Sequence, residues 1–391
     1  MIRKKIALSL SLALIAMTAA GCRAGSSSSG SGAAGTGAPA GTIKIGIVMP
    51  LTGSVATFGQ SAQKGLQLLE DQTNAAGGIL GKKVDFLFED DQATANICVA
   101  AGTKLITNDH VVAIIGPLTS TCANALAPIC QSNQIPMVTG TATNATVTQK
   151  GNYIFRTCFI DPFQGTVVAK FASANLKAKT AAVLYNNGDA YSDGLAENFI
   201  KSFKAAGGTI VKTETYNTGD KDFSSQLTQI APTKPDVMML PDYYSTVSLI
   251  AKQARAMNIQ STFLGGDGWD SSDLFTLGGD AVNGAYFSNH YSPDDTSPQV
   301  VQFLKDFKAK YSNQVPDAMA ALNYDAGKVL LQSIQKAGST KAADIQKALL
   351  AYDGTVVSGH IKFDSNRDAV KSAVIIKTVN GKETFFTKIN P

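Results

Sequence analysis

Residues 43–78 read IKIGIVMPLTGSVATFGQSAQKGLQLLEDQTNAAGG. The segment 43–49 is apolar and rich in β-branched side chains, which predicts a buried strand. Within 59–76, Leu66 and Leu69 belong to a set of apolar residues at helical spacing, and the pattern stops at a glycine pair. A buried strand followed by an amphipathic helix is the repeating unit of an α/β fold.

The same alternation continues along the chain. It predicts strands at 84–89, 111–115, 135–138, 181–185, 209–216, 237–240 and 262–264, and helices at 94–108, from 120, and at 194–206, 223–231 and 244–257. Toward the C-terminus it predicts helices at 317–336 and 340–351 and strands at 360–363, 373–379 and 384–389. The rhythm indicates parallel, doubly wound sheets, and its pause near residue 161 predicts two α/β lobes with a ligand cleft between them.

The N-terminal 41 residues are predicted to be an export signal and a tether. Residues 1–22, MIRKKIALSLSLALIAMTAAGC, join a basic start to an apolar run too short for a transmembrane helix, which needs about 20 residues. The ending TAAGC resembles the lipobox of bacterial lipoproteins, which implies a signal peptide over 1–21 and a lipid on Cys22; an ordinary signal peptide is the alternative. Residues 22–41 then form a Gly/Ser-rich linker to a body on the outer face of the cell membrane.

Composition narrows the function classes. The chain has 391 residues, of which 44% are hydrophobic and 16% charged, as in globular proteins of two or three domains. Without the three basic residues of the predicted signal, 31 basic residues face 30 acidic ones, which does not favour a nucleic-acid partner. The sequence has no nucleophile elbow, P-loop or HExxH motif, so we expect no enzyme, no cofactor and no metal.

Polar residues follow two neighbouring strands of the first predicted lobe. Ser120 falls at a helix N-cap just after strand 111–115, and residues 139–144, TGTATN, follow strand 135–138. Helix N-termini and hydroxyl groups suit a carboxylate, so the two loops predict an anion site. Plain helix capping is the alternative reading of the same residues.

The second predicted lobe presents a different chemistry at its strand ends. Asp267, with Asp242 as a second candidate, offers a carboxylate for an ammonium group, and Tyr191, Tyr243 and Trp269 offer aromatic walls. A site with anion-binding groups on one side and a carboxylate on the other is complementary to a zwitterion. The sequence therefore predicts an amino-acid ligand.

From Ile43 onward the chain resembles the leucine/isoleucine/valine-binding family of extracytoplasmic solute-binding proteins. The stretches that carry the resemblance are IKIGIVMPLTGSVATFGQ, QTNAAGGILGKKV, VVAIIGPLTST, IPMVTGTATNATVTQKGNYIFRT, AYSDGLA, GDKDFSSQL and KQARAMN. The resemblance implies a monomeric receptor that closes two lobes on an amino acid and delivers it to the permease of an ABC importer. It also implies a three-segment hinge near residues 161, 290 and 357, with residues 42–161 and 291–357 in lobe 1 and residues 162–290 and 358–391 in lobe 2.

Carried onto this sequence, the family's ligand-binding positions are Ser120 and Thr143 for the carboxylate, Thr141 for the ammonium through its carbonyl, and Asp267 as the acidic ammonium partner. The remaining lining is expected from Phe58, Leu118, Thr119, Ala142, Tyr191, Tyr243 and Trp269. Two departures leave the ligand open: Asp267 is shorter than the family's usual glutamate, and Asp242 and Trp269 are additional. Amides, urea or another small solute, and a sensory role for a membrane kinase, are the alternatives.

Four cysteines lie in the predicted body. An even number in an exported protein permits two disulfides in three possible pairings; Cys98–Cys122 is favoured because both residues fall at starts of adjacent predicted helices, and Cys130–Cys158 is a further candidate. Four buried free thiols are the alternative.

Overall fold

A computed structural model describes residues 41–390 of the chain; the predicted signal, Cys22 and most of the linker lie outside these residues. The predicted α/β class is confirmed, because two sheets alternate with helices along the described chain. None of the helices in this part of the chain combines the length and the apolar character that a membrane span requires.

The first sheet has five parallel strands in the order β2-β1-β3-β4-β5. Their bounds are β1 (Thr42–Met49), β2 (Lys83–Asp90), β3 (Ile114–Ile115), β4 (Met137–Thr139) and β5 (Ile154–Arg156). The strand order changes direction between β1 and β3, and in open α/β sheets the ligand binds beyond the carboxyl ends of the strands at such a point.

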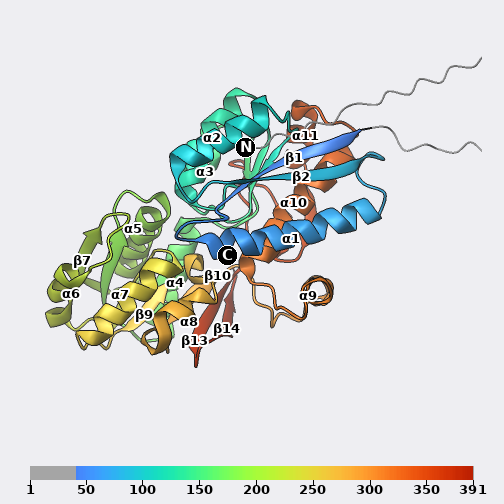
Figure 1. Ribbon diagram of the computed structural model, residues 1–391. Helices are drawn as coiled ribbons and strands as arrows, with labels where there is room; N and C mark the ends of the chain where they lie inside the picture. Colours follow the sequence, from blue (N-terminus) through green and yellow to red (C-terminus); the bar gives the residue numbers. More distant parts are fainter. Residues whose placement is uncertain (1–40, 391) are drawn as a thin grey trace, which may run out of the picture. The chain divides into compact units, whose positions relative to one another are not determined.

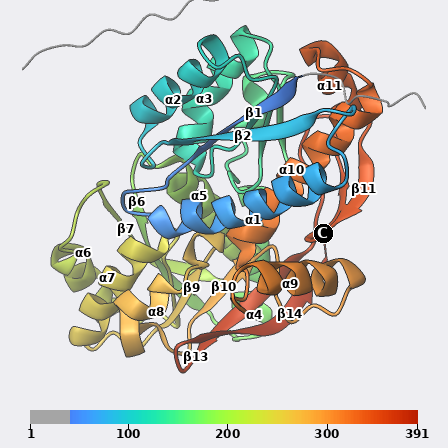
Figure 2. The same ribbon diagram turned by 45° about the vertical axis from the view of Figure 1, so that its right-hand side comes forward.

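Helices cover both faces of this sheet (Figures 1 and 2). They are α1 (Ala56–Ala75), α2 (Ala95–Thr107), α3 (Ser120–Ser132), α10 (Ala318–Ala337) and α11 (Ala342–Leu350). Ile45 and Ile47 of β1 pack with Leu66 and residues of α10, whereas Val48 packs with α2 and α3. Since side chains alternate across a strand, β1 is apolar on both faces.

The second sheet has seven strands in the order β14-β13-β10-β9-β8-β6-β7. Their bounds are β6 (Thr180–Asn186), β7 (Thr209–Tyr216), β8 (Val237–Met239), β9 (Thr262–Gly265), β10 (Tyr286–Asn289), β13 (Ala373–Val379) and β14 (Lys382–Ile389). β6 to β10 are parallel, and the two C-terminal strands are antiparallel at one edge. Here the order changes direction between β6 and β8.

Two core clusters show which helices cover which face of this sheet. α4 (Asp161–Ala174) and α5 (Ala190–Ala205) pack against one face, and α6 (Ser224–Ile230), α7 (Tyr244–Ala256) and α8 (Asp273–Gly278) against the other. The remaining elements are α9 (Pro298–Lys310), the hairpin of β11 (Asp353–Val356) and β12 (Gly359–Lys362), and the 3-10 turns η1 (Thr148–Lys150), η2 (Ala231–Thr233), η3 (Asp267–Trp269) and η4 (Gly279–Val282).

The sequence did not predict β5, β10, β11, α4, α8 and α9, and one predicted strand is shorter than expected. The helix α4 was not predicted, because its buried residues, among them Val167, Val168 and Phe171, lie on more than one side of the helix. The sequence therefore lacks the spacing of apolar residues that marks a helix with one buried face. The predicted strand 111–115 pairs as a β-ladder only at Ile114–Ile115.

The segment after β12 stays with the first sheet longer than expected. The Phe363 ring packs edge-on against Phe155 of β5, and Arg156 forms a buried ion pair with Asp368. We therefore propose that the third crossing between the lobes lies between Asp368 and the start of β13 at Ala373, rather than near residue 357.

Candidate functional site

A small cavity lies where the strand ends of the first sheet face those of the second. Its free volume is about 10 Å³, and its lining residues are Phe58, Leu118, Ser120, Thr141, Tyr191, Tyr243, Asp267, Gly268 and Met319. Seven of these nine are residues that the sequence predicted. They follow β1, β3 and β4 in the first sheet and β6, β8 and β9 in the second, so the cavity sits at the direction change of both strand orders.

The two polar loops of the first lobe are bonded to each other. Ser120 is the first residue of α3, and its Oγ accepts a hydrogen bond from the Asn144 backbone N–H at 3.1 Å. The Thr141 hydroxyl donates to the Leu118 carbonyl at 2.9 Å. The side of the cavity that carries the hydroxyl groups is therefore built within the first lobe alone.

A buried arginine holds the second of these loops from behind. The Arg156 guanidinium donates to the carbonyls of Ala142 at 2.9 Å and Asn144 at 2.7 Å. A planar, permanently charged fork of donors suits several acceptors at fixed positions. Ala142 therefore contributes to the loop's shape through its carbonyl and does not line the cavity.

The N-terminus of α3 faces the cavity through Ser120. The first turn of α3 contains no acidic residue, and its N-cap residue, Thr119, makes no side-chain capping bond. The Thr119 and Thr143 hydroxyls are both buried without a hydrogen-bond partner, although neither lines the cavity. Free N–H groups at a helix N-terminus suit an anion, and buried hydroxyls favour a polar partner.

On the opposite side, Asp267 is held by two donors. Its Oδ1 accepts from Gln164 Nε2 of α4 at 2.8 Å, and its Oδ2 lies 3.1 Å from His290 Nε2. The His290 ring stacks on Phe159 at 3.5 Å, and burial lowers the pKa of His290, which favours a neutral imidazole that donates from Nε2. Both donors are then neutral, so they orient the Asp267 carboxylate without cancelling its charge.

Two stacked tyrosines complete this side. The Tyr191 and Tyr243 rings lie 5.1 Å apart at an angle of 23°, and Phe58 meets Tyr243 edge-on at 5.9 Å. The Tyr191 hydroxyl accepts from the Gly268 N–H at 3.0 Å, whereas the buried Tyr243 hydroxyl has no partner. Burial raises the pKa of both hydroxyls, so they act as neutral groups.

Besides Thr119, Ala142 and Thr143, two further candidates, Asp242 and Trp269, lie outside the cavity. Asp242 accepts hydrogen bonds from the Tyr216 hydroxyl and the Tyr243 N–H, and burial raises the pKa of its carboxyl to about 7. Trp269 is fully buried, and its indole N–H donates to the Leu240 carbonyl at 3.0 Å. Asp242, the second candidate for the acid, and Trp269, expected as a wall, both pack inside the second lobe in this structure and do not face the cavity.

Hydrogen bonds join the two lobes around the cavity. The Thr121 hydroxyl donates to Asp189 Oδ2 at 2.8 Å, and Asn144 Nδ2 donates to the Ala190 carbonyl at 2.6 Å. The hydroxyls of Thr57 and Ser271 lie 3.0 Å apart. The described part of the chain therefore has the lobes closed over the cavity.

Sequence reasoning missed four residues of this site. Gly268 and Met319 line the cavity, and Gln164 and His290 hold Asp267. Met319 lies in the first turn of α10, which follows no strand, so the strand-end pattern carried no signal for it. His290 could have been found, because it lies in the predicted second hinge segment.

The four cysteines of the described chain are free, buried thiols. The expected disulfides Cys98–Cys122 and Cys130–Cys158 are therefore not formed in the structure. Cys98 Sγ donates instead to the Cys122 carbonyl at 3.5 Å, and Cys158 Sγ donates to the Ala142 carbonyl at the same distance. Burial raises the pKa of both Cys130 and Cys158 to about 12.

Comparison with known proteins gives consistent matches. The periplasmic binding protein family model matches residues 42–383. The Leu/Ile/Val-binding protein BraC3 of Rhizobium johnstonii is 35% identical over 304 residues, which cover 77% of this chain and 81% of that protein. The leucine-binding protein LivK of Thermotoga maritima has a TM-score of 0.86 and 36% identity, covering 89% of this chain and 99% of that one. LivJ of Streptococcus pneumoniae, a branched-chain amino acid transporter substrate-binding protein solved with isoleucine, has a TM-score of 0.85 and 32% identity, covering 90% and 100%.

Proposed function

We propose a function on the basis that this chain belongs to the periplasmic binding protein family. The chain is the extracytoplasmic receptor of an ABC importer, and it captures a small aliphatic amino acid between its lobes. Relatives of this kind are receptors for solutes, and we propose the same non-enzymatic role here. The ligand leaves the protein chemically unchanged.

One observation carries the proposal: a closed cavity has groups for an anion on one side and an uncompensated carboxylate on the other. Ser120 and the N-terminus of α3 would receive the ligand's carboxylate, and the family resemblance adds the Thr143 hydroxyl. Asp267 would receive the ammonium group, because its own donors are neutral. A buried ion is stable only when its charge is paired, so this arrangement selects zwitterions over neutral solutes of the same size.

The rest of the cavity supports an aliphatic side chain. Phe58, Leu118 and Met319 contribute apolar surface, with the Tyr243 ring beside them. These apolar groups favour leucine, isoleucine or valine over a basic amino acid.

We also propose how the receptor is placed. The lipobox-like segment before Cys22 supports a lipid anchor, and the Gly/Ser-rich linker would let the body reach the permease of its importer. Capture by a monomer is sufficient for this role, because both sides of the cavity come from one chain.

A thermal-shift screen tests the proposed function. The full chain, purified in detergent and refolded once to remove retained ligand, is screened against the twenty amino acids, urea, short amides and simple aromatic acids. A ligand at 100 times its dissociation constant adds about 2.7 kcal/mol to the free energy of unfolding. We expect the largest shifts with leucine, isoleucine and valine.

Other outcomes of the screen would change the proposal in defined ways. A shift with urea, an amide or an aromatic acid and none with amino acids would contradict the amino-acid assignment and leave the fold unaffected. Recovery of a chemically altered amino acid after incubation would contradict the receptor role.

A further inference from the structure

We propose that Asp91, Cys98 and Cys122 form a binding site for one thiophilic divalent cation, of which Zn²⁺ is the natural example. A carboxylate oxygen of Asp91 and the two sulfur atoms all lie within 4.8 Å of one another, and all three residues are buried. The site is separate from the ligand cavity and does not depend on the proposed function.

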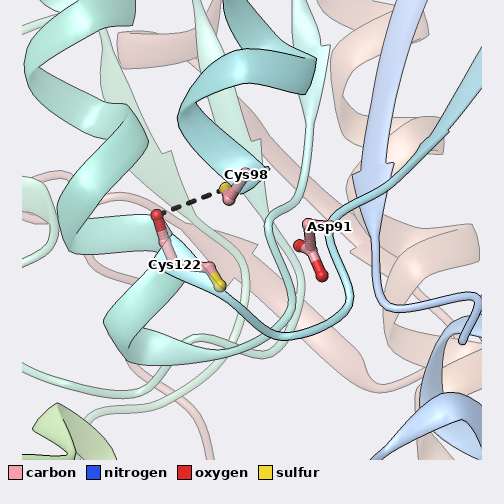
Figure 3. A group of neighbouring side chains, drawn as sticks. All are labelled: Asp91, Cys98 and Cys122. Carbon is pink, nitrogen blue, oxygen red and sulfur yellow. Dashed lines mark hydrogen bonds between the residues drawn. The ribbon is translucent and has the colours of Figure 1, made fainter. Parts of the chain in front are cut away.

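Three different segments bring these side chains together (Figure 3). Asp91 directly follows β2, Cys98 lies in the first turns of α2, and Cys122 is the third residue of α3. All three lie beyond the carboxyl-end edge of the first sheet. The backbone around Asp91 is fixed, since its N–H donates to the Met49 carbonyl at 3.0 Å and its own carbonyl accepts from the Thr94 N–H at 2.8 Å.

The Asp91 carboxylate supplies an independent indication of a ligand. Asp91 is 0% exposed; one of its oxygens accepts from the Ala93 N–H at 2.8 Å, and Oδ2 has no hydrogen-bond partner. A buried carboxylate oxygen without a partner is costly, and a cation beside it would remove that cost. Neither neighbouring thiol donates to Asp91 Oδ2, and Cys98 Sγ donates to the Cys122 carbonyl instead.

The donor set identifies the class of metal. Thiolates select soft or borderline ions, and a carboxylate beside them suits Zn²⁺ better than a monovalent soft ion. Around a tetrahedral Zn²⁺, with Zn–S of about 2.3 Å and Zn–O of about 2.0–2.2 Å, the ligand atoms lie about 3.5–3.8 Å apart. The cluster therefore needs only a small contraction, and a water molecule would take the fourth position, as in other sites with three protein ligands.

The binding of Zn²⁺ to this cluster balances in atoms and in charge. Binding of one Zn²⁺ breaks two S–H bonds, forms two Zn–S bonds and one Zn–O bond, and releases two protons to solvent. The cluster then carries a net charge of −1 before and after binding, as long as Asp91 is ionised. Both thiolates would lie at the N-terminal ends of helices, where the helix dipole favours negative charge.

A metal titration tests the site. The full chain is purified in detergent under reducing conditions, stripped with a chelator, and titrated with Zn²⁺ in competition with a chromophoric chelator; Co²⁺ serves as the spectroscopic substitute. We expect one ion per chain and a thiolate-to-cobalt charge-transfer band in the near ultraviolet. Cys98→Ser and Cys122→Ser should each weaken Zn²⁺ binding by more than about 100-fold, and Asp91→Asn by at least about tenfold.

Matched variants keep the test interpretable. Cys130→Ser removes another buried thiol from the same helix, α3, and should leave stoichiometry and spectrum unchanged. If a serine variant fails to fold, Cys98→Ala and the near-isosteric Asp91→Asn replace it, each checked by its thermal transition. Stoichiometric binding that survives loss of both Cys98 and Cys122, or no binding by the wild type, would overturn the proposal. A Cys98–Cys122 disulfide in protein isolated from the cell envelope without reductant would overturn it as well.

Discussion

The two sides of the ligand cavity are built in different ways. On the first-lobe side, the loops that carry Ser120 and Thr141 are bonded to each other and held by Arg156. On the second-lobe side, Asp267 depends on Gln164 and His290, which come from α4 and from the segment after β10. The first side is formed by loops that directly follow neighbouring strands, whereas the second side brings together residues from distant parts of the chain.

The two sides of the cavity also differ in charge. The first side offers neutral donors and a helix N-terminus, and the second offers one full negative charge. A full charge in a closed cavity has the larger energetic effect, so the second side should contribute more to affinity and the first more to orientation. Substitutions on the two sides of the cavity should therefore differ in their effect on ligand affinity.

Replacement of Asp267 by alanine should produce the largest loss of amino-acid affinity. Removal of one partner from a buried ion pair costs about 3–5 kcal/mol, which corresponds to about two to four powers of ten in the dissociation constant. Calorimetric titration of Asp267→Ala measures this loss. The matched control is Asp242→Asn, since Asp242 is equally buried but points to Tyr216, and it should bind nearly as well as the wild type. A loss of affinity in the Asp242 variant alone would show that Asp242, and not Asp267, pairs with the ligand's ammonium group.

Replacement of Ser120 by alanine should have an intermediate effect. The loss of one hydrogen bond to a buried, charged ligand costs about 1–3 kcal/mol, or about 5- to 150-fold in affinity. Thr119→Val removes a neighbouring hydroxyl that does not line the cavity and should change affinity much less. Equal losses in the two variants would show that the whole loop, and not the Ser120 hydroxyl, recognises the ligand.

The pH dependence of stability should report on the buried carboxyl of Asp242. Burial raises the pKa of Asp242 to about 7, above its ordinary value, so the folded state binds a proton that the unfolded state has already released. The stability contributed by this group is present at about pH 4 and is lost as the pH rises to about 7, with a slope of at most about 1.4 kcal/mol per pH unit.

Thermal unfolding of Asp242→Asn beside the wild type, from pH 4 to pH 8, measures this contribution. Asparagine has no proton to release, so the stability of the variant relative to the wild type should rise across this range and level off above about pH 7. A difference that does not change with pH would mean that Asp242 is already ionised in the folded protein at low pH.

The two stacked tyrosines should differ by the smallest amount. Tyr191→Phe removes a hydroxyl that accepts from the Gly268 N–H, at a cost of about 0.5–1.5 kcal/mol in stability. Tyr243→Phe removes a buried hydroxyl without a partner and should leave the free energy of unfolding unchanged or slightly higher. Chemical denaturation of both variants without ligand measures the pair, and a larger cost for Tyr243→Phe would contradict the assigned hydrogen bonds.

The same contrast explains how much the sequence could predict. Strand ends followed by Ser120, Thr141 and Asp267 are local patterns, and the topology of a parallel sheet brings such ends to one edge. Met319 and Gln164 reach the site from helices whose place depends on tertiary packing, and no local pattern marks them. Trp269 follows the same strand end as Asp267, but its side chain is buried in the core. Both residues lie in one 3-10 turn, in which side chains two positions apart point in different directions. Spacing along the chain also could not show that Cys98 Sγ is directed at a carbonyl rather than at the sulfur of Cys122.

We propose that each side of the cavity recognises one charge of a zwitterion. Calorimetric titration of the refolded protein with leucine, 4-methylpentanoate and isoamylamine tests it directly, because the last two compounds lack the ammonium and the carboxylate respectively. We predict that leucine binds, that both analogues bind at least about 100-fold more weakly, and that 4-methylpentanoate loses the most because Asp267 stays unpaired. Binding of either analogue within about tenfold of leucine would contradict the claim.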